Sequence, residues 1–572
     1  MLFGKMNYFM IGLLLAGGLL GLRVPAAAQG TVRCHLVYFR DKTGTPFRVD
    51  QPEAFLSARS LSRRSRQGLA VRARDLPVNP AYVARVRAVA GAPELRYTSR
   101  WLNAAVVVCD SGALARVRAL PEVSGTQTLS LAPTAASAGT AHVVAARPAV
   151  PNGVLTTAGP AGSWPALTTQ DDRATYGKAY GQDELLGAVA MHAAGFRGEG
   201  VRIAVLDAGF PGANTIAALA SLQSQGRLAG TRNFVDGGPN VFTRASHGTA
   251  CLSTLAANQP GFFIGTAPQA TYYLCITEDA TSERPIEEAN WLAAAEYADS
   301  AGVDIISSSL GYNLFDAPAR SYTYADFDGH TSLSTRAAVE AARVGMLAVV
   351  SAGNEGQKTW HYITAPADAD SIITVGAVDS LRFKAGFSSF GPTADGRLKP
   401  TLAAQGVQTA ILTPSGVAVR GNGTSFACPT LAGLAAGFWQ AHPQLSAQEV
   451  ISYLTRSASQ AMAPDNSLGY GIPNFTVAQV LVAAPAELQL FPNPLDGSGV
   501  LRLRLPAAYP PGQELRVRIS DARGALVRDF RLPAATGDIQ QLPVGVLPGG
   551  LYHCQLISAA GQPTRSVRFV QP

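Results

Sequence analysis

Apolar runs typical of buried strands alternate with helical stretches over the middle of this chain of 572 residues. Runs such as Ile203–Leu206 and Met346–Ser351 are short and apolar, whereas Ile286–Ser300 and Ser334–Val344 are longer and have helical spacing. This alternation predicts a mostly parallel sheet with helices on both faces, in which ligands gather where the strands end. Further strands are predicted at Tyr272–Ile276, Val303–Ser307 and Ile372–Val375, and further helices at Thr249–Ala257 and Thr430–Gln440.

An acid, an imidazole and an alcohol stand at such positions in three separate segments. Asp207 ends the strand that begins at Val201, and His247 leads a helix of small residues. Ser425 lies in Gly421-Asn-Gly-Thr-Ser-Phe-Ala-Cys-Pro429, which predicts a serine in the first turn of a buried helix, with Pro429 in that turn as well. Free amides and the positive end of the helix dipole would stabilise an oxyanion there. The chain order Asp, His, Ser is one of those known for a nucleophile, its base and the group that orients the base.

With these three motifs in this order, the chain resembles the subtilisin-like serine peptidases (subtilases) from near Tyr176 to Val482. The resemblance implies a subtilisin-like fold and a secreted endopeptidase that cleaves peptide bonds through an acyl-enzyme. It implies that Asp207 orients His247 and that His247 activates Ser425. It also implies that Asn354, in Ser351-Ala-Gly-Asn354, joins the Ser425 N–H as an oxyanion donor. An asparagine beside a glycine is also typical of a left-handed turn.

The same resemblance implies where a peptide substrate binds. Substrate would add as a strand along one segment, and a second segment would form the opposite wall of a side-chain pocket. The first segment contains Ser309, Leu310 and Gly311, and the second contains Ser351, Ala352 and Gly353.

The sequence departs from the family pattern at three places. Ala208 follows the acid where serine or threonine is usual, which removes a hydroxyl but keeps the carboxylate. Phe426 replaces the usual methionine after the serine, and the run Lys399-Pro400-Thr401 lacks the acid that usually follows Lys-Pro. We expect altered packing at Phe426 and a lost local hydrogen bond near Lys399.

Subtilases often bind structural calcium, and Asp326 and Asp328 beside Gly329 offer carboxylates for it. Two acids beside a glycine are more often a turn, however, and no complete calcium loop is present. We therefore assign no metal ligands, leave a structural calcium open, and predict no other cofactor.

Composition divides the chain into five parts. Residues 1–28 combine Lys5, an apolar core and Ala26-Ala27-Ala28, which is typical of a secretory signal peptide. Residues 29–130 predict a small α+β unit, which the resemblance makes a pro-region that acts as chaperone and inhibitor. Residues 131–172 are rich in Ala, Pro and Thr and predict a linker. Residues 173–485 form the catalytic domain, and residues 486–572 a C-terminal β-sandwich.

The sandwich is predicted from short strands separated by turns such as Asp521-Ala-Arg-Gly524. Phe491-Pro-Asn-Pro494 and Gly550-Leu-Tyr552 resemble the C-terminal sorting domain of the type IX secretion system, whereas a carbohydrate- or surface-binding sandwich would have similar strands. The sorting interpretation predicts secretion or a cell-surface location and a contact with secretion machinery. No later stretch is long and apolar enough for an integral membrane span.

The net charge of +7 comes mainly from arginine, and the densest cluster is Arg59–Arg66. A nucleic-acid patch, a protease-sensitive segment and a solvated helix face all have this composition. Because no nucleic-acid-binding motif accompanies it, we expect a solvated face and no nucleic-acid partner. The six cysteines have no metal-ligand spacing; a bridge between Cys34 and Cys109 stays open, and Cys251 and Cys428 are expected to be small core residues.

Two other functional classes remain to be weighed. A catalytically silent relative would only bind peptides in the same groove. An esterase of the α/β-hydrolase type would have its serine in Gly-x-Ser-x-Gly and the chain order Ser, acid, His. Ser425 instead lies in Gly-Thr-Ser-Phe-Ala and comes last of the three residues, which argues against an esterase.

Overall fold

The computed structural model describes residues 31–131, 170–483, 488–495, 499–505, 515–532, 539–557 and 563–572. The predicted signal peptide and most of the predicted linker lie outside these residues. Within the described residues, none of the helices has the length and apolar character that crossing a membrane requires.

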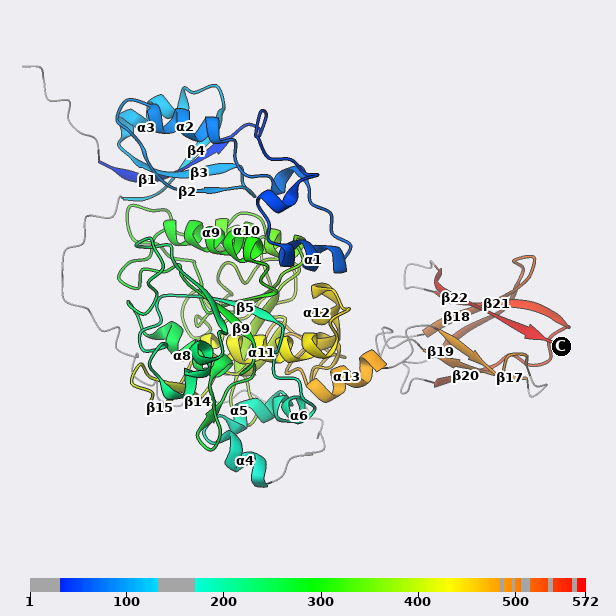
Figure 1. Ribbon diagram of the computed structural model, residues 1–572. Coiled ribbons are helices and arrows are strands. Elements are labelled where there is room, and N and C mark those ends of the chain that lie inside the picture. The colour runs from blue at the N-terminus through cyan, green and yellow to red at the C-terminus, as the bar shows by residue number, and fades with distance from the viewer. Residues whose placement is uncertain are drawn as a thin grey trace, which may run out of the picture.

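A parallel sheet of seven strands forms the centre of the molecule, in the order β13-β12-β11-β10-β5-β9-β6. This confirms the predicted α/β unit, and the predicted strands become β5, β9, β10, β11 and β12 (Figure 1). The two outermost strands, β6 and β13, were not predicted. The seven strands are β5 (Arg202–Asp207), β6 (Leu228–Asn233), β9 (Thr271–Ile276), β10 (Ile305–Ser308), β11 (Leu347–Ser351), β12 (Ile373–Val378) and β13 (Leu402–Gln405).

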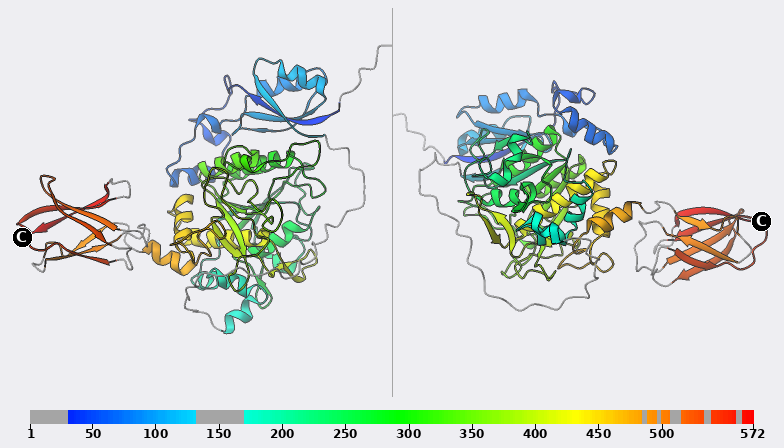
Figure 2. Two further views of the ribbon diagram at one scale, coloured as in Figure 1. Left: turned by 180° about the vertical axis from the view of Figure 1, so that it is seen from behind. Right: turned by 60° about the horizontal axis from the view of Figure 1, so that its bottom comes forward.

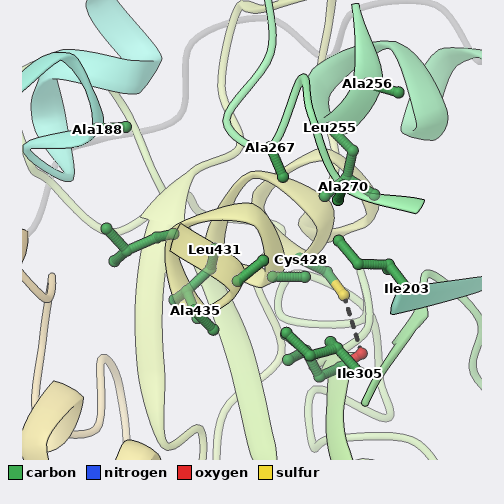
Figure 3. Packing of buried hydrophobic residues seen from close by; sticks show 14 of the residues in the cluster. Ala188, Ile203, Leu255, Ala256, Ala267, Ala270, Ile305, Cys428, Leu431 and Ala435 are labelled. Carbon is green, nitrogen blue, oxygen red and sulfur yellow. Dashed lines mark hydrogen bonds between the residues drawn. The ribbon is translucent and has the colours of Figure 1, made fainter. Parts of the chain in front are cut away.

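Helices cover both faces of this sheet because side chains alternate along each strand. In β5, Ile203 and Val205 join the core that contains α8 (His247–Ala256) and α11 (Thr424–Ala441). Ala204 and Leu206 join the opposite core, which contains α9 (Ile286–Ala301) and α10 (Leu333–Arg343). Figure 3 shows Cys428, Leu431 and Ala435 of α11 packed near Ile203 and Ile305, and the Cys428 thiol donates to the Val349 carbonyl at 3.3 Å.

Shorter elements complete this unit. Ser446 and Glu449 form the capping box of α12, so the helix begins as its sequence indicates. The remaining elements are α4 (Gln170–Tyr176), α5 (Tyr180–Leu185), α6 (Ala188–Ala193), α7 (Ser221–Ser224), α12 (Ala447–Arg456), α13 (Phe475–Ala483), β7 (Asn258–Gln259), β8 (Phe263–Ile264), β14 (Thr409–Leu412), β15 (Ala418–Gly421) and single 3-10 turns at Ala217–Leu219 and Tyr324–Asp326.

The N-terminal unit is an antiparallel sheet in the order β2-β3-β1-β4, with α2 and α3 on its outer face. Its other face packs on α9, as both views of Figure 2 show. Cys34 points to the α9 side and Cys109 to the α2–α3 side, so the two thiols are free and no bridge forms between them. Its elements are β1 (Arg33–Phe39), α1 (Ala58–Arg66), α2 (Pro80–Ala88), β2 (Glu94–Ser99), β3 (Ala104–Cys109), α3 (Ser111–Arg118), β4 (Val123–Leu131) and 3-10 turns at Pro52–Ala54 and Ala73–Asp75.

Helix α1 contradicts the prediction of a solvated arginine face. Arg63 is fully buried and Arg64 nearly so, because both pair with the buried Asp299 of α9. Arg59 pairs with Asp304 in the same region. The arginine cluster is therefore part of the contact by which the N-terminal unit docks on the sheet-bearing unit.

The C-terminal unit confirms the predicted β-sandwich. A three-stranded sheet, β16-β17-β20, faces a four-stranded sheet, β19-β18-β21-β22, across one shared apolar core. The unit lies beyond α13 in Figure 1. Its strands are β16 (Gln489–Phe491), β17 (Val500–Arg504), β18 (Leu515–Asp521), β19 (Leu526–Leu532), β20 (Ile539–Pro543), β21 (Gly550–Ile557) and β22 (Pro563–Gln571).

Candidate active site

Three neighbouring strands end at one edge of the central sheet and bring the predicted site segments together. Strand β10 pairs with β5 on one side and with β11 on the other, all in parallel. Asp207 therefore ends β5 next to Ser308 and Ser351, which end β10 and β11. The predicted acid and both predicted substrate-binding segments thus share one edge.

Asp207 and His247 are in direct contact. The carboxylate is fully buried, and its Oδ1 lies 2.8 Å from the imidazole Nδ1, while the His247 side chain is about a third exposed (37%). Glycine is required where their segments meet. A Cβ on Gly248 would lie 2.5 Å from the Gly209 carbonyl oxygen, and one on Gly209 would lie 2.3 Å from that of Thr243.

The second oxygen of Asp207 shows the effect of the sequence departure at residue 208. Oδ1 accepts hydrogen bonds from His247 and from the Ala208 N–H at 2.7 Å. Oδ2 is buried and has no partner among the described residues. Alanine at position 208 supplies no side-chain donor to this oxygen.

The surroundings of His247 favour its protonated form. Burial opposes a charged imidazolium, but the charge and hydrogen bond of Asp207 and the contact with Cys251 together outweigh burial and raise the pKa of His247 well above its ordinary value. An imidazole stabilised in this way is suited to accept a proton from a neighbouring group and to hold it.

Ser425 is the second residue of α11, and Pro429 has a role other than the one predicted. The helix begins at Thr424, so Pro429 lies inside it and not in its first turn. Because proline has no N–H, the carbonyl of Ser425, four residues earlier, has no helical donor. The Ser309 hydroxyl donates to this carbonyl at 2.7 Å and the Cys251 thiol at 3.3 Å. Because Pro429 leaves this carbonyl free, Ser425 is joined to the residue that follows β10 and to α8.

The Ser425 hydroxyl donates to the Ser309 carbonyl at 3.4 Å. It makes no hydrogen bond to His247 within the part of the chain that the structure describes. Cys251 lies between the two residues, since its sulfur is 3.8 Å from His247 Nδ1 and 4.0 Å from Nε2, and it also contacts the Ser425 carbonyl. Sequence reasoning placed Cys251 in the core only; its position one helical turn after His247 was the signal available.

Asn354 lies beside Ser425 with its amide group held in one orientation. Its Oδ1 accepts from the Thr424 N–H at 2.9 Å and from the Thr424 hydroxyl at 3.0 Å. Because Oδ1 takes both donors, Nδ2 is left to donate elsewhere, and a Cβ built on Gly423 would lie 3.8 Å from it. Gly353, with a φ of 104°, takes the left-handed conformation that the alternative interpretation gave to Asn354.

The two predicted substrate-binding segments face each other. The Ser351 hydroxyl donates to the Leu310 carbonyl at 3.4 Å, which joins the segments. Thr364, which sequence reasoning did not identify, lies between them. A Cβ on Gly311 would be 2.1 Å from Thr364 Oγ1, and one on Gly353 would be 2.9 Å from the same atom. The site residues placed here are Ser309, Leu310 and Gly311 on one side and Ser351, Ala352 and Gly353 on the other.

The other departures also have local explanations. Phe426 packs against His247, with ring centroids 5.9 Å apart. Lys399 is buried and donates to the Ala369 carbonyl at 2.7 Å and the Thr374 hydroxyl at 2.8 Å, so it keeps partners without an acid at position 401. Burial lowers the pKa of Lys399 to about 7.

Asp326 and Asp328 do not fit a calcium site. Asp326 accepts from the Thr323 N–H at 2.7 Å and pairs with Arg320, and Asp328 accepts from the N–H groups of His330 and Thr331 at 2.8 Å. Both carboxylates cap turns. Among the described residues, the one group of three side chains with metal-ligand atoms within 4.8 Å of one another is Asp207, His247 and Cys251, which belongs to the site above.

Comparisons with known proteins show a similarity to one family of peptidases. Residues 198–471 match the family model described as the subtilase family, and residues 34–142 match one described as the peptidase S8 propeptide domain of Bacteroidota. Subtilisin DY of Bacillus licheniformis is 30% identical over 278 residues, which are 48% of this chain and 89% of that protein. Subtilisin of Bacillus pumilus is 31% identical over 276 residues, covering 48% and 88%. The crystal structure of MycP1 without its N-terminal propeptide aligns with a TM-score of 0.42 and 22% identity, covering 52% of this chain and 96% of that one.

Proposed function

Because this chain belongs to the subtilase family of serine peptidases, we propose that it is a secreted serine endopeptidase with Asp207, His247 and Ser425 as its catalytic residues. The observation that carries the proposal is the contact between the buried Asp207 carboxylate and His247. The imidazole also contacts Cys251, which in turn contacts the Ser425 carbonyl. The buried carboxylate at this pair distinguishes it from an isolated histidine at a helix start.

The reaction follows from the chemistry of these groups. A free serine hydroxyl is a weak nucleophile near neutral pH, so Nε2 of His247 takes its proton as Oγ attacks the substrate carbonyl carbon. Asp207 keeps the proton of the imidazole on Nδ1 and stabilises the imidazolium that forms. The imidazolium then protonates the leaving amine, which breaks the C–N bond and leaves an acyl-Ser425 ester. Water, deprotonated by His247, hydrolyses this ester and restores the hydroxyl.

A serine rotamer change is part of this proposal. The hydroxyl that donates to the Ser309 carbonyl must turn toward His247 Nε2 before the attack. Rotation of Oγ about the Cα–Cβ bond moves it between staggered positions without moving the backbone, and catalytic hydrogen bonds are often long or misaligned in free enzymes.

The oxyanion of the tetrahedral intermediate would be held by two donors. One is the Ser425 N–H, a first-turn amide of α11 with no partner inside the helix. The other is Asn354 Nδ2, which Thr424 leaves free by occupying Oδ1. Donors held in place before the reaction stabilise developing charge without reorganisation.

The proposal extends to the other parts of the chain. Residues 29–130 would act as pro-region, a role supported by the propeptide-domain match and by the buried arginine contact with Asp299. Residues 1–28 would direct export, residues 131–172 would contain a processing site, and residues 486–572 would engage the secretion machinery. Deletion of the residues after Ala486 is then expected to retain the enzyme in the cell envelope. Unchanged secretion of the deleted protein would overturn the sorting role.

Hydrolysis of casein tests the catalytic proposal. We expect turnover by the wild type and by the surface control Arg320→Ala, whose side chain is 77% exposed, and its loss in Ser425→Ala and His247→Ala. Wild-type protein that is folded and processed but inactive would instead support a peptide-binding relative. Hydrolysis of short-chain esters without casein turnover would support the esterase alternative.

A further inference from the structure

The side-chain pocket beside Ser425 is closed by a residue that the sequence patterns did not mark. Its two walls begin close to the proposed nucleophile, since the Ser309 carbonyl accepts the Ser425 hydroxyl and Gly353 precedes Asn354. In the proposed function, a substrate residue whose carbonyl reaches Ser425 would place its side chain between these walls. What lies between the walls therefore limits that side chain.

Thr364 lies there, and the backbone holds it from both sides. The Thr364 N–H donates to the Ala352 carbonyl at 3.2 Å, next to Gly353 in one wall. The following residue, Ala365, pairs with Tyr312, which follows Gly311 in the other wall, through N–H to carbonyl bonds of 2.8 and 3.1 Å. Thr364 thus bridges the two walls, and its side chain does not depend on a flexible loop for its position.

The Thr364 side chain fills the space that the two wall glycines leave. Its Oγ1 would be 2.1 Å from a Cβ on Gly311 and 2.9 Å from a Cβ on Gly353, so glycine is required at both positions while threonine stands at 364. Ser389 Oγ, also 2.9 Å from the Gly353 position, closes the same corner. Thr364 itself is 3% exposed.

The Thr364 hydroxyl is buried without a hydrogen-bond partner within the described part of the chain. The hydroxyl therefore acts at this position only through the space it occupies, because no hydrogen bond of the fold depends on it. Exchange of this hydroxyl for a methyl group of similar size removes no hydrogen bond, which makes Thr364→Val a matched control for shape.

We propose that Thr364 is the specificity-determining residue of this site and restricts the substrate residue on the acyl side of the scissile bond to small side chains, Gly, Ala or Ser. This rests on the proposed endopeptidase function. Protein interiors are close-packed, so a leucine or phenylalanine side chain enters this pocket only if Thr364 or a wall moves.

Peptides that differ only at the residue before the scissile bond, with Gly, Ala, Leu or Phe, test the proposal with the full chain after maturation. We expect a wild-type kcat/KM for Ala about 100-fold or more above that for Phe, because even one methylene in a fitted pocket changes kcat/KM by about 10- to 200-fold. Thr364→Gly is expected to raise kcat/KM for Phe by about 100-fold with little change for Ala. Thr364→Val is expected to keep the wild-type ratio.

Each result has a defined meaning. A wild type that cleaves after Phe or Leu as fast as after Ala overturns the inference and leaves the endopeptidase function intact. A preference for Ala that Thr364→Gly and Thr364→Ala do not change assigns the restriction to another residue and also overturns it. Thr364→Ala, which keeps a Cβ, gives a smaller change in the same direction and serves if Thr364→Gly does not fold. Hydrolysis of no peptide by folded wild type counts against the proposed function itself.

Discussion

Removal of the Asp299 carboxylate is predicted to release helix α1 from the sheet-bearing unit. Asp299 is fully buried and contacts three arginines of the N-terminal unit: Arg64 at 2.8 Å, Arg100 at 2.6 Å and the fully buried Arg63. The Ser60 hydroxyl adds a hydrogen bond of 3.2 Å. Burial alone would raise the pKa of Asp299, but the arginines together hold it below its ordinary value, so the acid is ionised at neutral pH.

The magnitude follows from what Asp299→Ala leaves behind. Arg63 would stay buried without its anion, whereas Arg64 keeps its pair with Asp75 at 3.2 Å, and loss of one partner of a buried ion pair costs about 3–5 kcal/mol. Since about 1.4 kcal/mol is a tenfold change, opening of α1 should become about 10²- to 10⁴-fold more populated. Because the pKa of Asp299 is depressed in the folded state, the contact is fully formed above about pH 4 and weakens as the pH falls further.

Hydrogen exchange of the α1 amides measures this opening. The Ser425→Ala full-length chain is the background, since it is not expected to cleave itself, and the α11 amides serve as internal reference. Arg48→Ala is the matched control, because the Arg48–Asp50 pair has side chains 64% and 62% exposed and should contribute little to stability. If α1 exchanges equally in Asp299→Ala and Arg48→Ala, the arginine cluster does not hold the N-terminal unit in place.

Three further predictions concern the proposed catalytic residues. Asn354→Ala should lower kcat by about 10²- to 10³-fold with little change in KM, since such a donor acts on the oxyanion, and steady-state kinetics would contradict this if KM alone changed. The pH profile of kcat/KM should have the midpoint of its acidic limb above pH 6.5, because the pKa of His247 is raised and the base must be neutral. Asp207→Asn should move this midpoint to lower pH. An unchanged midpoint would argue against the Asp207–His247 pair. Ala208→Ser should stabilise the protein by about 1 kcal/mol through a hydrogen bond to Asp207 Oδ2. Urea unfolding in the Ser425→Ala background measures this difference. A loss of stability would show that the oxygen is not accessible to a donor at position 208.

Local patterns were sufficient to predict most of the central sheet and all of the C-terminal strands. Strands such as Ile203–Leu206 are buried on both faces and therefore apolar throughout, which makes them visible in the sequence. The edge strands β6 and β13 were missed for different reasons. The sequence of β6, Leu-Ala-Gly-Thr-Arg-Asn, is half polar because only part of it is buried, and β13 has only four residues and follows two residues after Pro400.

The sequence predicted those site residues that have a reactive side chain within a local motif. It missed residues whose role depends only on contacts in the tertiary structure. Asp207, His247 and Ser425 each lie beside glycines that permit close approach of two segments, and that signal is local. Thr364 comes well after Gly311 of the first wall, follows Gly353 of the second wall by 11 residues, and lies in no motif. The burial of Arg63 depends on Asp299, more than 200 residues later, and a run of arginines alone is more often solvated.

Covalent labelling of the folded protein by a fluorophosphonate tests the central claim most directly, since the reagent reacts with an activated serine. Peptide mass spectrometry should locate the adduct on Ser425 in the wild type, and His247→Ala should lose it. A mature, folded wild type without an adduct, or with the adduct on another serine, would contradict the assignment of Asp207, His247 and Ser425 as one catalytic unit.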